Sequence, residues 1–331
     1  MKKNLIWVNL LALCAFLLTA AVAVQAQNTR SWVSGTGSDA NACSRTAPCA
    51  TFAGALAKTL AGGEINALDE GGFGPVTINK AITIDGGSSF AGITAAGTVN
   101  GVTIAAGNTD VVVLRRLTIN GQTANTPAGA NGVRFNSGAA LIIEDCFIEN
   151  FDDHNINIVP TGGLGASGPH RVYIKNTSSV NSTNGAGIHT KTVAGDTIVA
   201  VIENCSLNNN VSGVLAEDGT VATIRGTTAT GRVGNTNIAV LPQASFGFWV
   251  NADALPVEMN LSNSSATHCL TGVRSIGVAV GSAIIRISGS QVFNNTFGLS
   301  NSPTGQIISF GNNSVSGNGT NGAPTSSVPP M

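Results

Sequence analysis

Two pairs of adjacent acidic residues have the type and spacing that acid–base catalysis or metal binding requires. Asp152 and Asp153 are adjacent and followed by His154, and Glu217 is followed by Asp218. Paired carboxylates act as acid and base in glycosidic-bond cleavage, and carboxylate oxygens also bind Ca²⁺. The alternative for Asp152 and Asp153 is an acidic turn without a chemical role. Neither pair has a supporting set of further ligands, so the sequence predicts no metal site.

Other familiar catalytic patterns are not found in the sequence. His170, His189 and His268 do not have the spacing of metal ligands, and no serine lies in a nucleophile-elbow pattern. The sequence therefore identifies no catalytic set by itself.

Eight segments of the chain repeat the same chemistry at the same positions. They begin at Leu114, Ile143, Ile174, Ile202, Ile224, Leu261, Ile287 and Phe310, with spacings of 22 to 37 residues. Repeats of this length that vary by insertion are typical of a stacked solenoid. Only 10% of the residues are charged and 41 are glycines, which favours many short strands joined by tight turns. The apolar first residue of each segment is expected to point inward.

The second position of the repeat alternates in charge. It is occupied by Arg115, Glu144, Lys175, Glu203 and Arg225, followed by Ser262, Ser288 and Gly311. If successive coils stack as parallel strands about 4.8 Å apart, the first five residues form an outward ladder of opposite charges. The alternation therefore predicts the register of the coils.

The third and fourth positions predict a bend and a return to the interior. The third is occupied by Arg116, Asp145, Asn176, Asn204, Gly226, Asn263, Gly289 and Asn312, most of which tolerate left-handed backbone angles. The fourth is occupied by Leu117, Cys146, Thr177, Cys205, Thr227, Ser264, Ser290 and Asn313. Small, weakly polar residues there suit a narrow stacked interior.

The cysteines divide into one pair and three single thiols. Cys43 and Cys49 bracket a short loop, for which we expect a disulfide; metal ligation is the alternative, but no histidine lies nearby. Cys146 and Cys205 are two coils apart, about 9 to 10 Å, which is too far for a disulfide. They and Cys269 are therefore expected to be free thiols.

The first 26 residues resemble a targeting segment. Lys2 and Lys3 precede an apolar run from Leu10 to Val24, and Val24-Gln25-Ala26 is a small-residue cleavage site. The sequence thus predicts a signal peptide, a secreted or periplasmic protein and no membrane span after cleavage; a retained anchor is the alternative. Without the two lysines, 14 basic and 17 acidic residues remain and no basic cluster, which argues against a nucleic-acid partner.

The repeat resembles the right-handed parallel β-helix of the pectate-lyase-like superfamily. A second strand follows each bend, commonly after a glycine, as at Gly132-Val133, Gly187-Ile188 and Gly213-Val214. The asparagine bend at 202–209 and the opening residues Trp32-Val33-Ser34 add to the likeness, which covers roughly residues 31–318. The resemblance implies an all-β solenoid with three short strands per coil.

The domain organisation follows from this resemblance. Thr51 is predicted to cap a helix from Phe52 to Leu60, with Phe52, Ala55, Leu56 and Leu60 on one face, closing the open end of the solenoid. We expect a signal peptide over 1–26, an N-terminal cap over 27–62, the β-helix over 63–318 and a flexible tail over 319–331. A monomer is expected.

In the resembled superfamily, substrate lies along the sheet formed by the strands after the glycine turns. Outward positions there are Arg134, Asn157, His189, Leu215, Trp249, Arg274 and Ser300, and one position further along come Asn136, Val159, Lys191, Glu217 and Asn251. We predict a substrate-binding stripe of Arg134, Asn157, His189, Lys191, Glu217, Trp249 and Arg274. An indole can stack on a sugar ring and guanidinium groups bind carboxylates. Scattered surface polarity is the alternative.

Three insertions lie beside this stripe. Residues 121–131 and 230–246 leave the solenoid on one edge of the sheet, and residues 160–170 leave on the opposite edge. Loops on one face of a repeat scaffold can wall a groove. Tolerated insertion without function is the alternative.

Three functions are compatible with the sequence. The first is polysaccharide or glycan binding along the stripe, without a cofactor. The second is a polysaccharide lyase or glycoside hydrolase, with Asp152, Asp153, His189 and Arg134 as candidate catalytic residues and Ca²⁺ possible for a lyase. The polygalacturonases of this fold carry paired aspartates, but no Gly-His-Gly follows here. The third is a structural or adhesive solenoid without a site.

Overall fold

The computed structural model describes residues 28–88, 91–121, 128–162, 168–193, 196–231, 245–279 and 282–329. The predicted signal peptide lies outside the described residues. So do the central parts of the three insertions, at 122–127, 163–167 and 232–244.

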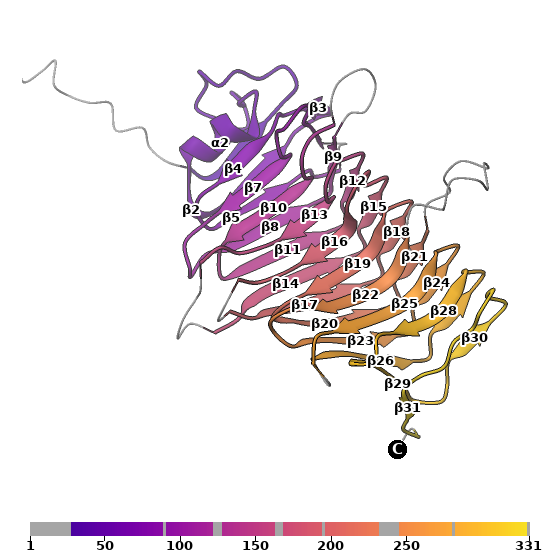
Figure 1. Cartoon of the computed structure of the whole chain (residues 1–331). Coiled ribbons are helices and arrows are strands. Elements are labelled where there is room, and N and C mark those ends of the chain that lie inside the picture. Colours follow the sequence, from indigo (N-terminus) through magenta and orange to yellow (C-terminus); the bar gives the residue numbers. More distant parts are fainter. Residues whose placement is uncertain are drawn as a thin grey trace, which may run out of the picture.

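The chain winds through three parallel sheets, and each complete coil contributes one strand to each sheet (Figure 1). The twelve-stranded sheet contains β1 (Asn28–Val33), β2 (Thr59–Ala67), β5 (Ile82–Asp85), β8 (Val111–Arg115), β11 (Ala140–Glu144), β14 (His170–Lys175), β17 (Ile198–Glu203), β20 (Thr220–Arg225), β23 (Val257–Ser262), β26 (Ala283–Ser288), β29 (Gly305–Ser309) and β31 (Ser326–Ser327).

The ten-stranded sheet follows the bend of each coil. It contains β3 (Gly71–Gly72), β6 (Ala91–Thr94), β9 (Leu117–Asn120), β12 (Phe147–Glu149), β15 (Ser178–Val180), β18 (Ser206–Asn208), β21 (Thr228–Thr230), β24 (Ser265–Thr267), β27 (Gln291–Phe293) and β30 (Ser314–Ser316).

The nine-stranded sheet completes the coil and carries the candidate site described below. It contains β4 (Val76–Ile78), β7 (Val102–Ala105), β10 (Val133–Ser137), β13 (Ile156–Ile158), β16 (Ala186–Thr190), β19 (Ser212–Glu217), β22 (Phe246–Ala252), β25 (Thr271–Gly277) and β28 (Phe297–Asn301). The expected all-β, right-handed parallel β-helix is confirmed.

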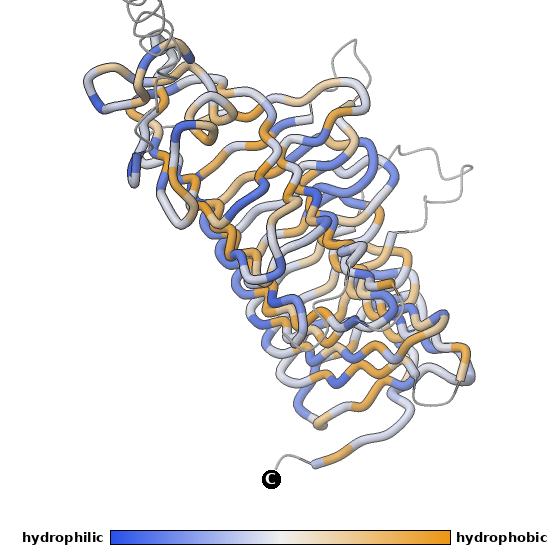
Figure 2. The backbone as a smooth tube through the Cα atoms, turned by 90° about the vertical axis from the view of Figure 1, so that its left-hand side faces the viewer, coloured by the Kyte–Doolittle hydropathy of each residue, from blue (hydrophilic) through white to orange (hydrophobic). Residues whose placement is uncertain are grey.

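The core follows from the period-two pattern of the strands. In β17, Ile198, Ala200 and Ile202 are buried, whereas Val199 and Val201 between them are partly exposed. Figure 2 shows that hydrophobic residues are distributed along the coils over the whole length of the stack. Inward residues of one coil lie on those of the next, so the burial of apolar surface stabilises the stack along its whole length.

One helix, α2 (Phe52–Lys58), lies at the N-terminal end of the solenoid (Figure 1). Thr51 caps it as predicted: its Oγ1 accepts a hydrogen bond from the Gly54 N–H at 2.9 Å. Phe52 is buried, but Leu60 is exposed and belongs to β2. The predicted helix end at Leu60 is therefore wrong, because the chain pairs with β1 from Thr59 onward.

The predicted charge ladder has the expected register. Arg115, Glu144, Lys175, Glu203 and Arg225 are successive partners on neighbouring strands. Arg115 lies 3.5 Å from Glu144, and Arg225 lies 3.2 Å from Glu203. The sign alternation was thus a correct guide to the stacking of five coils.

The bend is also as predicted in seven of eight repeats. Residues at the third position have φ between 48° and 57°, in the left-handed region. In the last repeat Ser309, not Phe310, is the partner of Ile287, and Gly311 (φ 81°), not Asn312, occupies the bend. That alignment is therefore wrong by one residue, because the bend requires a left-handed residue and glycine adopts that conformation at no steric cost.

The cysteines behave as predicted. Cys43 and Cys49 form a disulfide with a Cα–Cα distance of 4.7 Å. Cys146, Cys205 and Cys269 are free and buried. Burial raises the pKa of Cys146 to about 12, that of Cys205 to about 11 and that of Cys269 to about 12.

The C-terminal segment, for which a flexible tail over 319–331 is predicted, makes contacts with the last coil. Its β31 pairs with β29, and the Thr325 hydroxyl donates to the Ile307 carbonyl at 2.9 Å. The last coil thus has its edge partly covered by the chain that follows it. No helix within the described part of the chain is long and apolar enough to cross a membrane.

Candidate functional site

Residues far apart in the sequence form one row on the outer face of the nine-stranded sheet. Successive partners across its strands are Arg134, Asn157, His189, Leu215, Trp249, Arg274 and Ser300. Parallel strands lie about 4.8 Å apart, so the row brings together residues separated by many coils of sequence. The predicted stripe therefore has the register that the repeat indicated.

The row is less exposed than an outward position implies. Asn157 is 2% exposed and His189 is 7% exposed, whereas Arg134, Trp249 and Arg274 are partly exposed. The cover over His189 comes from His154, in the turn between β12 and β13, whose ring stacks on it at 4.3 Å between centroids and 25° between planes.

Each of these two histidines faces a carboxylate. His154 Nε2 lies 3.2 Å from Asp153 Oδ1, and His189 Nε2 lies 2.8 Å from Glu217 Oε2. We call Asp153, His154, His189 and Glu217 the histidine cluster. In this cluster the two histidine rings stack on each other, and each ring faces a different carboxylate.

The two carboxylates of the cluster have opposite pKa shifts. Burial raises the pKa of Asp153, and the positive charges of His189 and Arg134 only partly offset it. Burial also acts to raise the pKa of Glu217, but hydrogen bonds from His189 and Asn251 and the nearby charges outweigh it and lower that pKa to about 2. Asp153 thus holds its proton more readily than Glu217.

His154 is held neutral. Burial, with the positive charge of His189, lowers its pKa to about 3. Its Nδ1 accepts the Ala186 backbone N–H at 2.7 Å, so the ring proton lies on Nε2, which faces Asp153. His154 thus couples Asp153 to the strand β16 that carries His189.

Three carboxylates surround Lys191. Its Nζ lies 3.6 Å from Glu217, 3.9 Å from Asp218 and 3.9 Å from Asp253. Asp218 Oδ1 also accepts three backbone N–H groups, from residues 253, 254 and 255, at 2.9 to 3.1 Å. These residues do not fit a Ca²⁺ site, because an ammonium group and amide donors already take up the carboxylate oxygens.

Trp249 packs differently from a free stacking platform. Its ring lies 4.5 Å from that of Phe246, and the Arg274 guanidinium carbon lies 5.6 Å from its centroid and 4.8 Å from that of Phe246. The Trp249 Nε1 is buried without a hydrogen-bond partner in the described part of the chain. Burial lowers the pKa of Arg274.

The structure separates the two adjacent aspartates. Asp152 Oδ1 accepts a hydrogen bond from Asn184 Nδ2 at 2.8 Å, whereas Asp153 faces His154. The carboxylates that share a cluster are therefore Asp153 and Glu217, which are 64 residues apart in the sequence.

The sequence interpretation did not place His154 in the site. In the structure the Gly132 N–H, just before β10, donates to the His154 carbonyl. An alignment of the residues that precede each strand of this sheet would therefore have placed the His154 turn beside the start of β10. The described ends of two insertions also reach the row. Asn131 accepts a hydrogen bond from Asn157, and Phe246 packs on Trp249.

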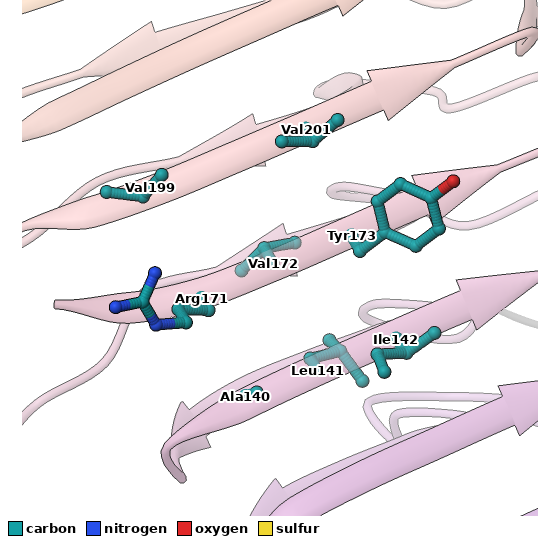
Figure 3. A pocket seen from close by; sticks show the side chains of 8 residues that line it. All are labelled: Ala140, Leu141, Ile142, Arg171, Val172, Tyr173, Val199 and Val201. Carbon is teal, nitrogen blue, oxygen red and sulfur yellow. The ribbon is translucent and has the colours of Figure 1, made fainter.

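A hollow lies on the outer face of the twelve-stranded sheet, and its walls are mostly apolar. Figure 3 shows Tyr173 between Ile142 and Val201 on the two neighbouring strands. Arg171 is the one charged side chain among the described residues that line it. Paired titratable groups thus belong to the nine-stranded sheet and not to this hollow.

Comparison with known proteins gives the fold its family context. The crystal structure of pectate lyase Pel9A matches with a TM-score of 0.59 and 14% identity, over 85% of this chain and 74% of that chain. A rhamnogalacturonan lyase matches with a TM-score of 0.53 and 13% identity, over 80% of this chain and 74% of that chain. The chain shares the parallel β-helix fold of these two structures. No family profile and no curated protein sequence matches it.

Proposed function

We propose that this protein is a secreted β-helix enzyme that binds an acidic polysaccharide across the nine-stranded sheet and hydrolyses it at the histidine cluster. The observation that carries this proposal is the pair of carboxylates with opposite pKa shifts, Asp153 and Glu217, coupled to one stacked histidine pair. When their environments shift the pKa values of two carboxyl groups in opposite directions, the group with the higher pKa can act as the acid and the other stays ionised. Both structural relatives are lyases of polysaccharides by name, which supports a glycan substrate.

The roles follow from the charges. Asp153, with its raised pKa, is the general acid that gives its proton to the leaving-group oxygen. Glu217 stays ionised and stabilises the positive charge that develops on the sugar ring. A water molecule then forms the new bond to the anomeric carbon, and the proton that it releases restores the acid form of Asp153. Arg134 and Arg274 lie in the same row. They bind the carboxylates of the polysaccharide on either side of the cleaved bond.

The test is incubation of the mature protein with a panel of uronic-acid and neutral polysaccharides, monitoring reducing ends and unsaturated products separately. We expect new reducing ends without unsaturated products. Asp153→Asn should lower turnover by at least about 100-fold while binding persists. Asp152→Asn is the matched control, because that carboxylate is adjacent but bonded to Asn184. Unsaturated products would instead show elimination, and equal effects of the two variants would exclude Asp153 as the acid.

Glycan binding without turnover is the second candidate function. It is favoured by the saturation of Glu217, whose oxygens accept from His189 and Asn251 and lie 3.6 Å from Lys191. A carboxylate with so many partners is a weak base. Slower migration of the protein through a gel that contains the polysaccharide, with no product from any member of the panel, would favour this function over hydrolysis.

A further inference from the structure

His189 is a buried histidine with hydrogen bonds at both ring nitrogens. Its Nδ1 lies 3.0 Å from Asn157 Oδ1, and its Nε2 lies 2.8 Å from Glu217 Oε2. A neutral imidazole has one donor nitrogen and one acceptor nitrogen, whereas an imidazolium donates from both. The charge of His189 therefore depends on whether these two neighbours accept or donate.

The orientation of the Asn157 amide follows from fixed backbone donors. The His154 backbone N–H donates to Asn131 Oδ1 at 3.3 Å, which identifies that atom as an acceptor. Asn157 Nδ2 lies 2.9 Å from the same oxygen, so it is the donor. The Asn157 oxygen consequently faces His189, and His189 Nδ1 must carry a proton.

The next amide in the series has the same sense. Both the backbone N–H and the side-chain amide of Asn131 donate to Asn100 Oδ1, each at 3.1 Å. Hydrogen bonds therefore run in one direction from His189 through Asn157 and Asn131 to Asn100. Reversal of any amide would place two donors or two acceptors against each other in a buried region, which is costly.

The other ring nitrogen also faces an acceptor. Independently of His189, Glu217 Oε1 accepts a hydrogen bond from Asn251 Nδ2 at 3.0 Å and lies 3.6 Å from the Lys191 ammonium group, and both contacts favour the ionised carboxylate. An ionised carboxylate only accepts. His189 Nε2 must therefore carry a proton as well.

The charged groups around the ring agree with a cation at this position. Glu217 is the ionised neighbour of His189, and the stacked His154 is neutral, with its Nδ1 accepting a backbone N–H. Arg134, in the same row, and Lys191 are also positive, but Lys191 lies among Glu217, Asp218 and Asp253. The imidazolium thus has an ionised carboxylate as its direct hydrogen-bond partner.

We propose that Asn157, oriented by Asn131, is a positioning residue that holds His189 as an imidazolium donating to both Asn157 and Glu217. The charge is built in by the amide series and does not depend on bound substrate. The role of this charge in cleavage, keeping Glu217 ionised beside an anionic glycan, rests on the proposed function.

The test is ¹⁵N NMR of His189 in the full mature chain without substrate. We expect both ring nitrogens to be protonated at neutral pH, as in an imidazolium that donates from both nitrogens. One unprotonated nitrogen in the wild-type protein at neutral pH would overturn the proposal.

Variants show whether Asn157 acts as a hydrogen-bond acceptor or only through packing. Asn157→Leu removes the acceptor, so His189 should become a neutral imidazole at pH 7.5, whereas Asn157→Asp retains an oxygen and should restore the second N–H. Asn210→Leu is the matched control, because Asn210 is also 2% exposed but does not contact His189. An unchanged His189 spectrum in Asn157→Leu, or an equal change in Asn210→Leu, would contradict the assigned role.

The kinetics of cleavage separate this inference from the proposed function. In Asn157→Leu, kcat/KM should fall by about tenfold, because Glu217 loses the charged donor beside it, and Asn157→Asp should restore it. If the NMR result holds and no polysaccharide is cleaved, the proposed function is wrong and the assignment of His189 stands. If polysaccharide is cleaved but His189 is neutral, the proposed function stands and the assignment of His189 is wrong.

Discussion

The outer faces of the twelve-stranded and nine-stranded sheets use the same stacking for different purposes. On the twelve-stranded sheet, the ladder from Arg115 to Arg225 places one charge per coil, and each contact joins neighbouring strands. On the nine-stranded sheet, charged and polar side chains are crowded, and turn residues such as His154 lie over the row. Regular spacing gives register and modest stability, whereas the irregular face gives shifted pKa values.

Exposure explains why the two faces differ. The Arg225 side chain, which pairs with Glu203, is 59% exposed, whereas the His189 side chain, which pairs with Glu217, is 9% exposed. Water screens the first pair, and exposed pairs contribute less than about 1 kcal/mol. The second pair has lost water on the histidine side, so breaking it leaves a buried cation without a partner.

The largest effect is expected at Glu217. Glu217→Gln leaves His189 without its carboxylate and Lys191 with two of its three, so the free energy of unfolding should fall by about 2 kcal/mol and any turnover by at least about 100-fold. Urea denaturation and the reducing-end assay measure the two effects. Glu203→Gln on the twelve-stranded sheet is the control and should cost less than about 1 kcal/mol. Equal costs would remove the difference between the two faces.

Acid should destabilise the nine-stranded face at a pH set by His154. The folded-state pKa of His154 is about 3, below its usual 6.5, so between these values the unfolded chain binds a proton that the folded chain does not. Stability should therefore fall as the pH drops below 6.5, by roughly 1 kcal/mol per pH unit. Glu217, with its pKa lowered from 4.5 to about 2, adds a loss below pH 4.5.

Urea denaturation at pH 7.5, 6.5, 5.5 and 4.5 measures this slope. His154→Asn should flatten the curve between pH 6.5 and 4.5. His268→Asn is the control, since His268 is exposed, lies outside the cluster and has a positive φ that asparagine tolerates. A slope that persists in His154→Asn would show that other groups cause it.

The smallest effect is expected in the charge ladder. Glu203→Lys places a cation between Lys175 and Arg225 and removes the hydrogen bond from the Tyr173 hydroxyl at 3.0 Å. We expect a loss of about 1 kcal/mol that added salt reduces. Ser262→Lys, beside Arg225 and Ser288, has a single like-charged neighbour and should cost less. Equal costs would mean that the sign alternation contributes nothing to stability.

Sequence alone determined the coil, its register and its bends. Inward apolar residues, alternating charges and left-handed positions recur once per coil, so each repeat reinforces the alignment of the others. The prediction failed at the last repeat, where Phe310 matched the apolar column but Gly311 was required at the bend. A single terminal repeat has one neighbour to fix its register.

Tertiary structure decided which side chains act together. The stacking of His154 on His189, the grouping of Asp153 with Glu217, and the packing of Arg274 over Trp249 all depend on turns and long side chains that have no period. The direction of the Asn157 amide was likewise set by the His154 backbone N–H, which acts through Asn131 of the neighbouring coil. Periodic patterns specify where a residue lies on the solenoid, but contacts and burial specify its charge.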